Sequence, residues 1–125
     1  MTKTYEKVGK GAFFENDTGG NDKRPRYKGN MEISGKEFDI ALWPRVGKSG
    51  HKYMSMQINL KGAREAIGDG ALFLRDQKSN RAPSLTGPIE IMERKFQGSV
   101  WPQKAENGTE YYRLKVELVT ESEEG

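Results

Sequence analysis

Residues 36–60 read KEFDIALWPRVGKSGHKYMSMQINL, and residues 94–118 read RKFQGSVWPQKAENGTEYYRLKVEL. The two stretches align without a gap at an offset of 58 positions, and the alignment extends back to residues 25 and 83. Rare residue types such as Trp and Pro fall in register, which chance explains poorly, and an internal repeat of this kind defines the unit of a fold. The identical positions are Pro25/Pro83, Gly29/Gly87, Glu32/Glu90, Ile33/Ile91, Phe38/Phe96, Trp43/Trp101, Pro44/Pro102, Gly50/Gly108, Tyr53/Tyr111 and Leu60/Leu118.

The repeat continues upstream, where residues 9–14 match residues 68–73 once a single residue is inserted. We therefore interpret the chain as a tandem duplication of a unit of about fifty residues. The first β repeat spans 9–60 and the second spans 68–118, and we expect the two to pack as one globular unit. Residues 119–125 are interpreted as an acidic C-terminal tail.

Both units show the period-two alternation of β-strands, in which successive side chains point to opposite faces. Every second residue is apolar along 36–43 and 53–60. The first of these strands is expected to stop at Pro44, which cannot donate to a ladder. Ser34-Gly35 is expected to form a hairpin turn, and 61–67 a single helical turn between the units.

The expected strands are 11–16, 31–33, 36–43, 53–60, 70–75, 87–91, 95–101 and 111–119. The fold class that follows is all-β, with two tandem pseudo-symmetric four-strand antiparallel repeats. The architecture is expected to be OB-like or a small barrel or sandwich.

The composition excludes several kinds of chemistry. The 125 residues contain no Cys, which excludes disulfides, Cys-based zinc sites and thiol nucleophiles. The only His is His51, and no paired carboxylates recur in a pocket-like setting. We therefore expect a protein that is not an enzyme and that binds no metal or cofactor. No apolar run approaches the roughly 18 residues of a membrane span, so we expect no membrane association and an intracellular location.

Strand alternation places aromatic residues on the polar face of each unit. Trp43 and Tyr53 lie at opposite ends of one hairpin loop, and Trp101 and Tyr111 occupy the same places in the second unit. Such residues can clamp their own hairpin by cross-strand packing, or they can present rings on which the bases of a single strand stack. The sequence leaves both interpretations open.

Positive charge is concentrated in the first unit. Residues 1–60 carry eleven Lys or Arg against seven acids, whereas residues 61–125 carry ten against eleven. Cationic loops interleaved with aromatic residues are typical of proteins that bind a phosphate backbone with unstacked bases. The candidate nucleic-acid-binding residues are Lys23, Arg24, Arg26, Tyr27, Lys28, Trp43, Arg45, Lys48, Lys52, Tyr53, Trp101 and Tyr111.

Short motifs of the first unit resemble those of a known group of proteins. The motifs are Gly-Ala-Phe-Phe at 11–14, Tyr27-Lys28-Gly29, Gly35-Lys36-Glu37-Phe38, Trp43 and the run from Gly50 to Ser55. They resemble small proteins encoded by phages and plasmids, which usually have one copy of the unit. This resemblance implies a cytoplasmic location in a bacterial host cell. More loosely, the chain is similar to phage single-stranded-DNA-binding proteins with OB-like folds, in size, strand content, basic-aromatic surface and acidic tail.

Two functions from different classes follow as expectations. The first is a non-catalytic, phage-type protein that binds single-stranded DNA in replication or recombination through basic loops and exposed aromatics. The second is a phage- or plasmid-encoded protein-binding module, such as an anti-defence inhibitor, that uses the same aromatics as interface anchors. The expected partners are single-stranded nucleic acid and a protein docked on the acidic tail. The sequence leaves open whether the chain also forms a homodimer.

Overall fold

The computed structural model describes residues 2–21, 23–76, 79 and 81–122. Within these residues the chain forms eight strands and no helix. The strands are β1 (Thr2–Glu15), β2 (Tyr27–Ile33), β3 (Lys36–Val46), β4 (Lys52–Leu60), β5 (Ala66–Leu74), β6 (Leu85–Ile91), β7 (Arg94–Lys104) and β8 (Glu110–Ser122). The all-β prediction is confirmed.

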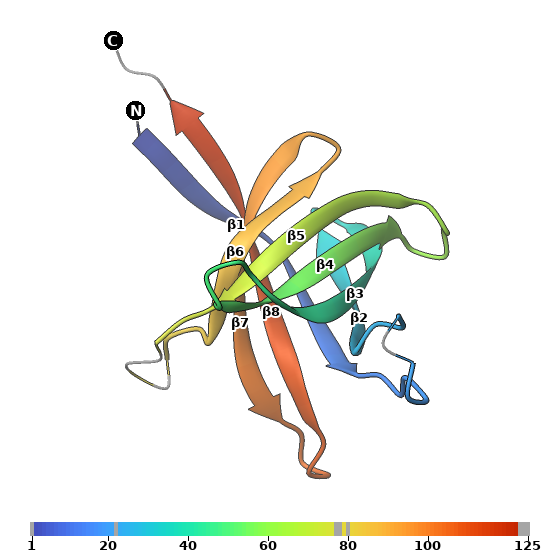
Figure 1. Cartoon of the computed structure of the whole chain (residues 1–125). Helices are drawn as coiled ribbons and strands as arrows, with labels where there is room; N and C mark the ends of the chain where they lie inside the picture. The colour runs from blue at the N-terminus through green and yellow to red at the C-terminus, as the bar shows by residue number, and fades with distance from the viewer. Residues whose placement is uncertain (1, 22, 77–78, 80, 123–125) are drawn as a thin grey trace.

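The strands close into a single barrel in which each strand pairs antiparallel with its neighbours in sequence (Figure 1). Pairing of β1 with β8 closes the barrel, from Thr2↔Ser122 to Phe14↔Tyr111. Of the predicted architectures, the structure has the small barrel. An OB-fold is a five-stranded Greek-key barrel, and the meander order of eight strands differs from that arrangement.

Several boundaries predicted from the sequence are wrong, among them the start of β2 at Tyr27, the start of β5 at Ala66 and the end of β7 at Lys104. Strand β1 starts at Thr2 and is much longer than predicted. Strand β3 continues through Pro44 to Val46, because beyond Leu42 it pairs only with β4 and an edge strand tolerates a missing N–H. Residues 61–65 form a turn in place of the predicted helical turn, since Gly62 has a φ of 78° and its N–H donates to Asp39 Oδ2 at 3.0 Å.

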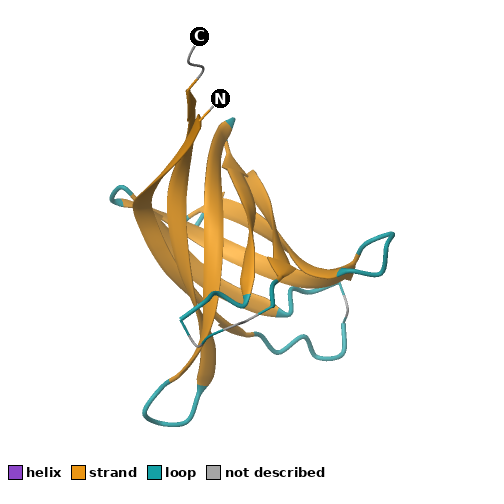
Figure 2. Ribbon diagram, turned by 90° about the vertical axis from the view of Figure 1, so that its left-hand side faces the viewer, coloured by secondary structure: helices purple, strands orange, loops and turns teal. Residues whose placement is uncertain are grey.

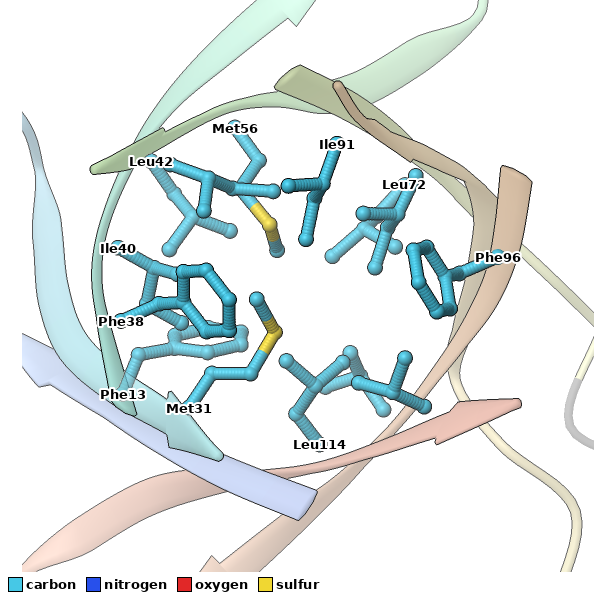
Figure 3. Packing of buried hydrophobic residues seen from close by; sticks show 14 of the residues in the cluster. Phe13, Met31, Phe38, Ile40, Leu42, Met56, Leu72, Ile91, Phe96 and Leu114 are labelled. Carbon is cyan, nitrogen blue, oxygen red and sulfur yellow. The ribbon is translucent and has the colours of Figure 1, made fainter. Parts of the chain in front are cut away.

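The barrel interior is filled with apolar side chains from all eight strands (Figure 3). The alternating apolar residues at the centres of β3, β4 and β8 are buried: Phe38, Ile40, Leu42, Met56, Ile58, Leu114 and Val116. Fully buried side chains include Phe13, Leu42, Ile58, Leu72, Val100 and Val116. Because the core is packed, any ligand must bind at the ends of the barrel or on its outer wall.

The two ends of the barrel differ in their connections (Figure 2). One end, the loop end, carries the connections 16–26, 47–51, 75–84 and 105–109. The other end, the turn end, carries the tight connections 34–35 and 92–93, together with 61–65. Among the described residues of 15–28, 45–52, 74–85 and 103–110, ten Lys or Arg stand against five Asp or Glu. The loop end is therefore more basic than the chain as a whole, whose net charge is +3.

Both hairpin turns at the turn end use positive φ at their two central residues. The predicted turn at Ser34-Gly35 is present, with φ values of 50° and 84°. The equivalent turn at Met92 and Glu93 has φ values of 47° and 73°. Two positive φ values match the right-handed twist of a two-residue hairpin. Residues other than Gly and Asn adopt these values at a cost in free energy.

Candidate functional site

A groove opens at the loop-end mouth of the barrel, with a volume of about 550 Å³. It lies between the ends of β2, β3, β4, β5 and β6, and we call it the mouth groove. Its lining residues are Arg26, Tyr27, Pro44, Arg45, Val46, Lys52, Tyr53, Met54, Leu74 and Leu85. The volume falls within the range of small-molecule sites.

The charged lining of the mouth groove is cationic. Arg26, Arg45 and Lys52 line it, and none of its described lining side chains is acidic. The acid nearest to these cations among the described ion pairs is Glu15, whose Oε1 lies 4.0 Å from Arg26 Nε at the exposed surface. Exposed pairs of this kind contribute little, so the groove keeps a net positive charge that suits an anion.

Stacked aromatic rings lie beside the groove on the outer wall. Tyr53 of β4 stacks on Phe73 of β5 with ring centroids 5.3 Å apart. The His51 ring lies 5.8 Å from Tyr53 and 5.7 Å from Phe73. Tyr53 is also the cross-strand partner of Arg45, which places the ring cluster beside a groove cation. Rings and cations in this arrangement can hold a base and its phosphate together.

A second aromatic cluster closes the interior below the mouth. Phe13 stacks on Tyr112 at 5.0 Å, and Tyr27 meets both rings edge-on at 5.8 and 5.5 Å. Burial raises the pKa of the Tyr112 phenol above its ordinary value, and the neighbouring Tyr27 adds to the effect. Tyr112 therefore keeps its proton at neutral pH, and the cluster seals the core against solvent.

The two tryptophans are half-buried and are tied to the long loops. Trp43 Nε1 donates to the Lys23 carbonyl oxygen at 3.1 Å, and Trp101 Nε1 donates to the Arg81 carbonyl oxygen at 2.9 Å. Each indole therefore holds a loop against the barrel wall, a structural role that leaves part of the ring accessible.

The surroundings of the two indole rings differ. The Arg113 guanidinium lies 5.0 Å and the Lys115 ammonium 5.4 Å from the centroid of the Trp101 ring. The corresponding cross-strand partner of Trp43 is Ser55. The Trp101 ring is thus occupied by the protein's own cations, whereas Trp43 has a polar, uncharged neighbour.

Another groove, of about 610 Å³, runs along the outer wall across β8, β1, β2 and β3. Its lining includes Trp101, Arg113, Lys115 and Lys10 on one side, with Glu37 and Asp39 on the other. Because both signs of charge line this groove, it is a weaker candidate for an anionic polymer than the mouth groove.

The predicted site residues do not all meet. Arg26, Tyr27, Arg45, Lys52 and Tyr53 come together at the mouth groove. The exposed Lys23, Arg24 and Lys48 lie on the loops nearby, and Lys28 lies on the outer wall opposite Phe14. Tyr111 stacks on Phe14 at 5.3 Å, away from the mouth groove, and Trp101 lies on the β7–β8 wall.

Several residues of these surfaces were not predicted from the sequence. Phe73, Val46, Met54 and Leu74 border the mouth groove or its ring cluster. Phe73 and Phe14 occupy matching places in the upstream part of the repeat, and this signal could have identified both. Their contacts with Tyr53 and Tyr111 depend on which strands pair, which the alternation pattern does not reveal.

The described residues contain neither a cluster of metal-ligating side chains nor a membrane-spanning helix. In these ranges, no three His, Cys, Asp or Glu side chains gather in a way that could hold a metal ion. The same part of the chain contains no helix long and apolar enough to cross a membrane.

The fold and the site together define a filled eight-stranded antiparallel barrel with a cationic, partly apolar mouth. No family model, no curated protein and no solved structure matches the chain.

Proposed function

We propose that this protein binds single-stranded DNA without catalysis, and that the loop end of the barrel is its binding surface. The observation that carries the proposal is the mouth groove, where Arg26, Arg45 and Lys52 line an apolar depression beside the stacked Tyr53 and Phe73 rings. Cations bind the phosphates, and the rings and apolar floor accept unstacked bases.

Single strands fit this surface better than a duplex does. The described residues form no helix that could enter the major groove of a duplex. Base stacking on side chains requires bases that are splayed out, which a duplex withholds. The loops 16–26 and 47–51 would then flank the path of the strand, with Lys23, Arg24 and Lys48 near its backbone.

The internal repeat supports an origin by duplication, which we include in the proposal. Equivalent hydrogen bonds recur 58 positions apart: Arg26 N to Leu42 O and Ser84 N to Val100 O are both 2.9 Å long. Under this reading the unit 9–60 specialised in binding while 68–118 kept the fold, because the mouth groove takes its three cations from the first unit. The phage-type and replication or recombination roles rest on the resemblance stated above.

One observation favours the second candidate function, a protein-binding module. Val46 and Leu74 border the mouth groove and are 67% and 58% exposed. Apolar side chains surrounded by cations are also typical of a surface that holds an acidic partner protein.

Titration of fluorescent oligo-dT and of a duplex of equal length at two salt concentrations separates these functions. We expect the single strand to bind more tightly than the duplex and its affinity to fall steeply with salt. Equal affinity for both forms, or no binding at low salt, would refute DNA binding at this surface and leave the protein-binding function.

A further inference from the structure

The opposite mouth of the barrel, at the turn end, is open and apolar. A pocket of about 340 Å³ lies there, at the small end of the range for ligand sites. Its lining residues are Ile33, Ser34, Lys36, Phe38, Leu60, Ile67, Ile91, Met92, Arg94 and Phe96. We call it the turn-end pocket.

The core is sealed less well at this pocket than elsewhere. Ile33, Ile91, Phe38 and Phe96 are 8%, 7%, 5% and 5% exposed, whereas every other buried apolar residue is at most 3% exposed. Leu60, at the rim, is 39% exposed. The pocket therefore gives a ligand direct access to apolar side chains that belong to the core, and covering them removes apolar surface from water.

The charged groups of the turn-end pocket have a single sign. Lys36 and Arg94 line it from equivalent places on the two hairpins, and none of the described lining residues is acidic. Glu37, the neighbour of Lys36, is held by Lys61, whose Nζ lies 3.0 Å from Glu37 Oε2. Within the described part of the chain, neither Lys36 nor Arg94 forms an ion pair. Both cations are therefore available to a ligand.

From these observations we propose that the turn-end pocket binds a small amphiphile with an anionic head group, of the fatty-acid class. The hydrocarbon chain enters between Ile33, Phe38, Ile91 and Phe96. The carboxylate stays at the rim between Lys36 and Arg94. Charge complementarity selects the anionic head, and the small volume selects a single short chain.

Methyl NMR of the full chain with decanoate as the probe tests this proposal. We expect saturable shifts confined to the methyl groups of Ile33, Ile67 and Ile91, with weaker binding of decanol and weaker still of decyltrimethylammonium. The variant K36E/R94E should bind decanoate about tenfold more weakly, because both head-group contacts become repulsive. The control K95E/K104E makes the same change in net charge at two exposed lysines of β7 outside the pocket, and it should bind as the wild type does.

Several results would overturn the proposal. One is the absence of shifts at these methyls, and another is equal affinity for the three probes, which would show an apolar patch with no head-group site. Equal losses in K36E/R94E and K95E/K104E would show an effect of net charge alone. Shifts of the same methyls with protein concentration alone would show that a second copy covers the mouth.

Discussion

Neutralising the three cations of the mouth groove should flatten the salt dependence of DNA binding. In the variant R26Q/R45Q/K52Q the groove loses all of its described charged lining. Each phosphate contact on a single strand contributes about 0.7 to the slope of log affinity against log salt. If each cation binds one phosphate, the slope should fall by about 2. Between 50 and 200 mM salt, the advantage of the wild type over the variant should then shrink about twentyfold.

The assay is fluorescence anisotropy with labelled oligo-dT at four salt concentrations between these limits. A matched control removes the same charge from the opposite end of the barrel, in K36Q/R64Q/R94Q. The control should keep the slope of the wild type, because its cations lie away from the proposed DNA path. An unchanged slope in the mouth variant would refute phosphate binding at the groove. Equal flattening in both variants would show that only the net charge matters.

Three further predictions concern the stability of the barrel and the two tryptophans. Glu93→Gly should stabilise the fold by about 1 kcal/mol, because Gly adopts a φ of 73° without strain; a melting temperature that does not rise would contradict this. Tyr112→Phe should reduce the stability that the protein loses above about pH 10. The raised pKa of Tyr112 stabilises the fold at pH values below the pKa of the unfolded chain, and this contribution is lost as the pH rises through the folded pKa. Urea unfolding at pH 8 and pH 11 checks this, and the exposed Tyr5→Phe should leave the loss unchanged. Trp101→Ala should lower the free energy of unfolding by about 0.5–1 kcal/mol more than Trp43→Ala does, because the Trp101 ring also packs against cations. Trp43→Ala should in turn lower oligo-dT affinity more than Trp101→Ala does. Equal effects of the two variants on unfolding and on binding would contradict this prediction.

The sequence by itself determined the class of fold and most of the core. Alternation along 36–43 and 53–60 identified the inward faces correctly, since strand side chains alternate with period two wherever one face is buried. The repeat also predicted that Trp43 and Trp101 occupy equivalent positions, and in the structure each indole holds a long loop. The inward faces depend on residues close together in the chain, and the equivalence of the two indoles follows from the repeat, so the sequence was sufficient for both.

Only the tertiary structure decided how the strands outside the predicted hairpins pair, and therefore which surfaces exist. Closure of β1 on β8 brings Phe14 to Tyr111, and pairing of β4 with β5 brings Phe73 to Tyr53. The alternation pattern assigns a face to each side chain but no neighbour across the sheet, so neither contact could be predicted. The same pairing gathers Arg26, Arg45 and Lys52 at one mouth, because a barrel places residues of adjacent strands side by side. Tyr111 lies instead beside β1, where it stacks on Phe14, and Lys28 lies farther along β2 on the outer wall.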